Sequence, residues 1–188
     1  MRLAAATISR FGIAAALAAA LAVASTGCGG QARHADAAPS SAAAPQALPT
    51  AGFDPCVALT PQFLGERRWD ALAPSPRRDT SGDISWQGCR YVARAGYGFV
   101  VETTNATLGQ VRAKFPAAVD ISFAGRKALR YEARPDVPGG CTINIEMGAG
   151  SLYLMTDVPQ TPATTALDAC EIATDIAYAV VPLLPAGS

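Results

Sequence analysis

The chain has two kinds of apolar pattern: one continuous block near the N-terminus and short periodic runs after residue 53. In residues 141–147, apolar and polar side chains alternate, and a period of two residues predicts a β-strand. Four other segments have the extended, turn-bounded character of strands. We therefore expect five strands, over residues 84–93, 97–104, 126–133, 141–147 and 151–156.

Three segments show helical signals instead. A Thr-Pro pair opens the segments 60–69 and 161–181, and Thr is a good N-cap while Pro suits the first helical position. Residues 108–115 carry apolar side chains at i, i+3 and i+7, which predicts a short helix ended by Pro116. The C-terminal helix is expected to end at Pro182, with an apolar stripe of Ala169, Ile172, Ala173, Ile176 and Val180.

Together these elements predict an α+β fold, with an antiparallel sheet of about five strands and helices packed mainly on one face. The polar, turn-rich residues 74–83 are expected to form a loop. Residues 53–188 are expected to be a single globular domain, since their length suits one domain.

The N-terminal block has the features of an export signal. Arg2 and Arg10 are the only charges before the apolar run Phe11–Ala24, and small residues then lead to Cys28. The run is about 14 residues long, shorter than the roughly 20 that a membrane-spanning helix needs. A cysteine directly after Thr-Gly resembles a bacterial lipobox, although Ser25 stands where Leu is preferred. We expect residues 1–27 to be a signal peptide and Cys28 to be lipidated, whereas the alternative is an ordinary signal cut elsewhere.

Residues 28–52 are rich in Ala, Pro, Ser and Gly and are expected to form a disordered tether, because they hold too little apolar surface to offset ordering entropy. The predicted location is the extracytoplasmic face of the cell membrane, with the membrane as a partner through lipidated Cys28. The single histidine, His34, lies in the tether, and no rigid element is expected beside it.

The five cysteines fit an exported lipoprotein. If Cys28 is lipidated, four cysteines remain, and an even number can pair in disulfides. Their spacings do not match a zinc knuckle or a Cys-x-x-C motif, and an oxidising compartment favours disulfides. We favour Cys56–Cys89 with Cys141–Cys170, because Cys141 lies on the apolar side of its strand, which should face the helix that holds Cys170. The nested pairing, Cys56–Cys170 with Cys89–Cys141, stays open at this point.

Several short motifs occur in an order that resembles an uncharacterised family of actinobacterial lipoproteins, domain of unknown function 3558. The resemblance covers about residues 53–185, with Tyr91 at a position where the family more often has Trp, and implies an envelope lipoprotein without catalytic residues. It is carried by Asp54-Pro55-Cys56, Leu59-Thr60, Cys89-Arg90-Tyr91, Gly125-Arg126-Lys127-Ala128, the strand of Cys141, Cys170-Glu171-Ile172-Ala173 and Leu184-Pro185.

The residues themselves carry no recognisable catalytic, metal or cofactor motif. The predicted domain has no histidine to serve as a base, and the acidic group Asp168, Glu171 and Asp175 has the spacing of a solvated helix face. We therefore expect no enzymatic activity, no metal and no cofactor.

Charge is balanced overall, with 15 basic and 15 acidic residues, which gives no reason to expect nucleic-acid binding. The charges are unevenly distributed along the chain. Residues 67–134 carry 12 basic and six acidic groups, and residues 135–188 carry six acidic groups and no basic one. Arg126, Arg130 and Arg134 fall on one side of the expected strand 126–133 and form a candidate basic face for an envelope partner. Alternatively, the two segments neutralise each other across the fold.

These observations predict an exported, lipid-anchored protein of the cell envelope. We expect a non-catalytic binding or sensor module, with an accessory or structural lipoprotein as the alternative. A deep apolar cavity beneath the sheet favours the first and a filled core favours the second.

Overall fold

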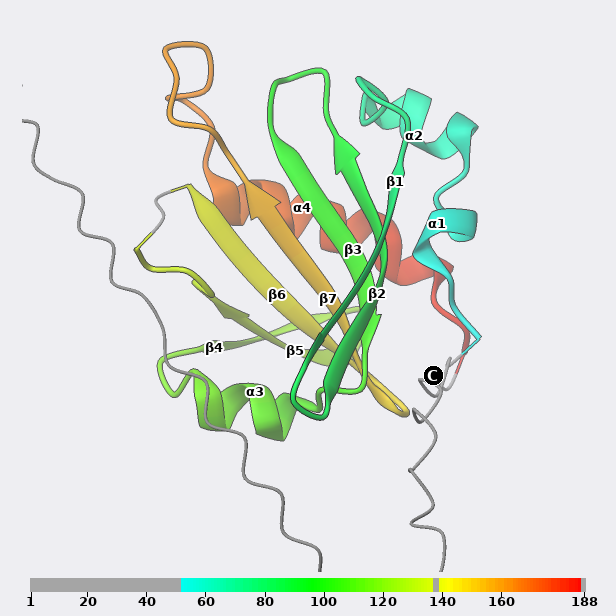
Figure 1. Cartoon of the computed structure of the whole chain (residues 1–188), viewed down its shortest axis with the longest axis vertical. Coiled ribbons are helices and arrows are strands. Elements are labelled where there is room, and N and C mark those ends of the chain that lie inside the picture. The colour runs from blue at the N-terminus through cyan, green and yellow to red at the C-terminus, as the bar shows by residue number, and fades with distance from the viewer. Residues whose placement is uncertain (1–51, 137–138, 187–188) are drawn as a thin grey trace, which may run out of the picture. The chain divides into compact units, whose positions relative to one another are not determined.

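A computed structural model describes residues 52–136 and 139–186 (Figure 1). Its centre is a seven-stranded antiparallel sheet in the order β1-β2-β3-β7-β6-β5-β4. The strands are β1 (Ser75–Ser81), β2 (Ile84–Val92), β3 (Gly98–Thr104), β4 (Val119–Phe123), β5 (Arg126–Tyr131), β6 (Gly140–Met147) and β7 (Gly150–Asp157). The helices are α1 (Pro55–Ala58), α2 (Pro61–Arg67), α3 (Leu108–Lys114) and α4 (Ala169–Val180), followed by the 3-10 turn η1 (Val181–Leu183).

The α+β class and the five expected strands are confirmed, but the number of strands is wrong because the two edge strands, β1 and β4, were missed. β1 lies within residues 74–83, which were expected to form a loop. All seven of its residues are exposed, so it has no apolar alternation to reveal it, and its pairing with β2 holds it in place. β4 is only five residues long and pairs on one side with β5.

Two helix starts are confirmed by their caps. The Thr60 hydroxyl accepts a hydrogen bond from the amide of Phe63 at the start of α2. Thr107 and Gln110 form a reciprocal capping box at the start of α3. The single-turn helix α1, which was not expected, has Asp54 as its N-cap.

The expected start of the C-terminal helix at Thr161-Pro162 is wrong. That pair opens a turn in which the Thr161 amide donates to the hydroxyl of buried Thr164. α4 begins only at Ala169, because the Asp168 carboxylate caps the amides of Cys170 and Glu171, both at 2.8 Å. A carboxylate N-cap satisfies two of the four free amides and fixes the start of the helix there.

One face of the sheet is buried beneath helices. α4 lies behind the sheet in Figure 1, and its apolar stripe packs against the inward side chains of β6 and β7. The side chains Ile143, Ile145, Leu152 and Leu154 on the strands are at most 1% exposed. α1 and α2 cover the same face beside β2 and β3, where Trp69 contacts Phe99 edge to face at 5.1 Å.

The structure contains the two disulfides that we favoured, Cys56–Cys89 and Cys141–Cys170. The first joins α1 to β2 and the second joins β6 to the first turn of α4, so the nested pairing is excluded. Tyr91, two residues after Cys89, is 1% exposed, and its hydroxyl donates to the carbonyl of Pro55 at 2.9 Å. The disulfide and this hydrogen bond both fasten α1 to the sheet.

The predicted signal peptide, lipidated Cys28 and tether lie outside the described residues, apart from Gly52. None of the helices in the described ranges is long and apolar enough to cross a membrane.

Removing the disulfide between β6 and α4 should cost substantial stability. The double variant Cys141→Ala/Cys170→Ala frees a loop with a sequence separation of 29 residues, and the chain-entropy model predicts a loss of about 3–4 kcal/mol. Urea unfolding under oxidising conditions measures this loss. Cys28→Ala is the matched control, because neither disulfide includes Cys28. An unchanged unfolding free energy in the double variant would contradict the structural role of this bridge.

Candidate functional site

The second face of the sheet carries aromatic and polar side chains, and α3 is packed at one end of it (Figure 1). The strand register places one row of residues side by side across this face: Arg77, Gly88, Glu102, Tyr153, Asn144 and Leu129. Side chains alternate between the two faces of a strand, so every member of this row points away from α4. This face is called the open face below.

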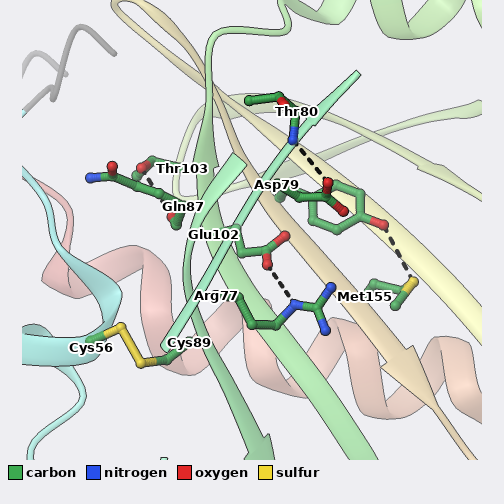
Figure 2. Close-up of polar contacts among 10 residues, drawn as sticks. Cys56, Arg77, Asp79, Thr80, Gln87, Cys89, Glu102, Thr103 and Met155 are labelled. Carbon is green, nitrogen blue, oxygen red and sulfur yellow. Dashed lines mark hydrogen bonds and ion pairs between the residues drawn. A yellow bond between two sulfur atoms is a disulfide. The ribbon is translucent and has the colours of Figure 1, made fainter. Parts of the chain in front are cut away.

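Glu102 is a buried acid near the middle of the open face. Its side chain is 5% exposed, and its Oε1 accepts from Nε of Arg77 at 3.2 Å (Figure 2). Gly88 lies between the two residues on β2 and has no side chain to separate them. A Cβ on Gly88 would lie 2.1 Å from the carbonyl oxygen of Val101, so the close approach of β2 and β3 requires glycine.

Burial disfavours the charged form of Glu102 and raises its pKa above the ordinary value, and the charge of Arg77 offsets part of that rise. Burial likewise raises the pKa of Tyr153 to about 12. The Tyr153 hydroxyl lies 3.3 Å from the sulfur of Met155. Tyr153 therefore stays neutral at physiological pH and offers a mainly apolar ring to the open face.

A chain of hydrogen bonds orients Tyr131 on β5. Its hydroxyl donates to Oδ1 of Asn144 at 2.8 Å, and Nδ2 of Asn144 donates to the hydroxyl of Ser151 at 2.7 Å. Ser151 in turn donates to the backbone carbonyl of Ala106 at 2.7 Å. With its hydroxyl engaged, the Tyr131 ring stacks on Phe115, with ring centroids 4.3 Å apart.

Three adjoining hollows follow the open face along the strands. The first, of about 210 Å³, lies between α3 and the sheet, and its lining includes Ile84, Trp86, Phe115, Tyr131, Asn144 and Tyr153. The second, of about 240 Å³, contains the Arg77–Glu102 pair and shares Ser81, Trp86 and Tyr153 with the first. The third, of about 220 Å³, shares Arg77, Val100 and Met155 with the second. The three are called the open-face groove below.

The far end of this groove is rich in arginine. Arg77, Arg90 and Arg134 line the third hollow, together with one carboxylate, that of Asp157. Arg77 is paired with Glu102, whereas Arg90 and Arg134 form no hydrogen bond or ion pair with any other residue that the structure describes.

The three arginines of the predicted basic face are not on one surface. Nη2 of Arg126 donates to the carbonyl of Pro185 at 2.8 Å. Arg130 lies on the α4 side of the sheet and lines a shallow surface hollow with acidic residues of α4. Arg134 lines the open-face groove instead. The strand ends at Tyr131, so the alternation that grouped these side chains does not extend to Arg134.

The acidic residues Asp168, Glu171 and Asp175 share that surface hollow with Arg130. This arrangement favours the alternative that basic and acidic segments offset each other across the fold. Asp168 also caps α4 through its carboxylate. Across residues 52–136 and 139–186, no group of three or more His, Cys, Asp or Glu side chains is placed to hold a metal ion.

Of the residues that line the open-face groove, sequence reasoning singled out only Arg134 as a candidate binding residue, although part of the signal for the others was present. Trp86 and Tyr153 lie in expected strands, and their side chains point to the face opposite the apolar residues that pack on α4. Two aromatic side chains on that face indicate a surface that can bind another molecule. Arg77 could not be placed, because its strand was expected to be a loop. The Arg90–Arg134 juxtaposition depends on a turn after β5 that no periodic pattern describes.

Comparison with known proteins adds a family. A family model described as "Protein of unknown function (DUF3558)" matches residues 23–183. Neither the curated proteins nor the solved structures yield a match to the chain.

Glu102→Gln should stabilise the protein at neutral pH. The folded-state pKa of Glu102 lies above its ordinary value of 4.5, so the folded protein binds this proton more tightly than the unfolded chain does. The unfolding free energy therefore falls as the pH rises from 4.5 through the folded-state pKa. A neutral amide removes this penalty and its oxygen can still accept a hydrogen bond from Arg77, so we expect a higher unfolding free energy for the variant at pH 7.

The gain should disappear as the pH falls below 4.5, where Glu102 is protonated in both states. Unfolding in urea at a series of pH values measures it. Glu146→Gln removes an exposed carboxylate from β6 and controls for the change in net charge. A loss of stability at pH 7 in the Glu102 variant would show that attraction to Arg77 outweighs burial.

Proposed function

The chain belongs to the DUF3558 family of proteins of unknown function, and from that premise we propose that it is an exported, lipid-anchored, non-catalytic binding module of the cell envelope. Its binding site is the open-face groove. The observation that carries the proposal is the aromatic first hollow on the open face.

The aromatic lining supports binding of an apolar group. Trp86, Phe115, Tyr131 and Tyr153 surround the first hollow and are only partly buried, whereas the aromatic side chains of the α4 face, such as Phe99, are fully buried. Aromatic rings that keep exposed surface gain free energy when an apolar molecule covers them. A ligand in the first hollow would supply that cover.

A non-catalytic role is supported by the chemistry of the same side chains. Burial raises the pKa values of Tyr131 and Tyr153, so neither hydroxyl is a base at neutral pH. The Glu102 carboxylate is engaged by Arg77. The tyrosine hydroxyls therefore serve as neutral contacts, and these groups can hold and orient a ligand.

Export and anchoring are supported by the N-terminal sequence. The positively charged start, the apolar run and Cys28 have the order of a lipoprotein signal, and two disulfides suit an oxidising compartment. The residues from Gly29 to Gly52 would separate the binding site from the membrane surface.

The second candidate is an accessory envelope lipoprotein without a ligand. The filled core on the α4 face favours it. The modest size of the first hollow, about 210 Å³, also favours it, since sites for drug-sized ligands usually measure about 300–1,000 Å³. The two candidates differ in whether the aromatic hollow takes up a small apolar molecule.

Cys28→Ala should release the protein from the membrane. Acyl chains contribute about 0.8 kcal/mol per buried methylene, so loss of a multiply acylated cysteine removes the anchor. Detergent partitioning and fractionation of cells that express the full chain measure the release. Ser25→Ala, a change of a small residue in the same segment, is the control and should stay membrane-bound. Unaltered partitioning of the Cys28 variant would overturn the lipid anchor.

The two tryptophans allow a direct test of the aromatic hollow. Trp86 lines it, whereas Trp69 is buried on the α4 face and donates through Nε1 to the hydroxyl of Tyr97 at 2.9 Å. In a Trp69→Phe chain, 1-octanol should shift Trp86 emission to shorter wavelength with saturation, because it displaces water from the ring.

The matched Trp86→Phe chain retains Trp69 and should show no such shift. Both chains carry Cys28→Ala, so that detergent is not needed. A titration that leaves Trp86 unchanged, or that moves Trp69 equally, would favour the accessory role over binding.

A further inference from the structure

We propose that the open-face groove binds one elongated amphipathic anion, with its apolar part in the first hollow and its anionic group at Arg90 and Arg134. This inference rests on the proposed binding function and adds the chemical class and the orientation of the ligand. It is argued from the continuity of the groove, the different character of its two ends and the distribution of charge along it.

The groove is continuous along β2. Ile84 lines its first hollow and Arg90 its third, and the middle hollow shares residues with both. Six residue steps along a strand, at about 3.3 Å each, give a length of about 20 Å. That length fits an extended molecule better than a compact one.

The two ends differ in chemistry. The first hollow is bordered by the Phe115–Tyr131 stack and the apolar cluster under α3, which includes Val111 and Leu129. Its one charged lining residue is Lys114, whose side chain is exposed and whose Nζ lies 5.5 Å from the centre of the Phe115 ring. This end suits an apolar or aromatic group.

The third hollow suits an anion. Three arginines line it against the single carboxylate of Asp157, and Arg77 alone among the three is paired. Gly98 leaves room for Arg90, since a Cβ there would lie 3.3 Å from Nη2 of the guanidinium. Planar guanidinium groups bind carboxylate or phosphate oxygens with two parallel hydrogen bonds.

The middle hollow determines the orientation. Its charged lining residues are Arg77, Asp79 and Glu102, so it carries one basic group against two acidic ones. An anionic group would be repelled there and attracted to the third hollow, while Trp86, Val100 and Met155 give the middle section apolar surface for the rest of the ligand.

The test compares dodecanoate with 1-dodecanol, which differ in charge and share a chain long enough to reach from Trp86 to the arginines of the third hollow. Both are titrated against the full Cys28→Ala/Trp69→Phe chain, with Trp86 emission as the signal. Dodecanoate should bind about tenfold more tightly than dodecanol, because one charge-assisted contact contributes on the order of a tenfold change in affinity. The preference should weaken in high salt, since both arginines are exposed.

Substitutions locate the anionic group. Arg90→Gln/Arg134→Gln should remove the preference for dodecanoate and leave the affinity for dodecanol unchanged, which also shows that the variant is folded. Lys114→Gln changes the charge at the opposite end of the groove and should keep the preference. Arg78→Gln, on the same strand as Arg77 but directed to the other face, is the second control and should also keep it.

The outcomes separate the two levels of the proposal. If neither dodecanol nor dodecanoate changes Trp86 emission, the binding function itself fails. If both bind equally, or if the arginine variant keeps the preference, the groove takes an apolar ligand and the anion inference alone is overturned. If Lys114→Gln removes the preference instead, the proposed orientation is overturned.

Discussion

The burial of one face of the sheet against α4 is the constraint on which the rest of the structure depends. Ile143, Ile145, Leu152 and Leu154 must face the helix, because exposing each of them to water would cost about 1.5–3 kcal/mol. Strand side chains alternate, so this requirement also sends Asn144 and its neighbours to the opposite face. The core and the open-face groove are therefore two consequences of one register.

The two disulfides hold the helical layer onto the buried face at opposite ends of the chain. Cys56–Cys89 fastens the first helix to β2, and Cys141–Cys170 fastens the first turn of α4 to β6. With the helices fixed there, the open face is bounded by α3 at one end and by arginines at the other. A groove with such different ends gives a bound molecule a direction as well as a position.

Polar groups in the middle of the open face are stabilised by specific partners. Glu102 is tolerated because Arg77 reaches it from the edge strand across Gly88, and Asn144 is tolerated because Tyr131 and Ser151 satisfy its amide. Across the described ranges, no buried side-chain nitrogen or oxygen lacks a hydrogen-bond partner. A fully satisfied polar network can rigidify the face that carries it.

The sequence by itself determined the α+β class, the five inner strands, the Thr60 cap of α2 and the position of α3, because each depends on local periodicity or on a local hydrogen bond. It favoured the observed cysteine pairing, and the structure excluded the nested one. Only the tertiary structure decided the edge strands and the composition of the groove. β1 has no apolar alternation and exists through its pairing with β2, and Arg90 and Arg134 meet although 44 positions separate them in the sequence. Such juxtapositions follow from strand order and turn geometry, which are non-local and leave no periodic trace in the chain.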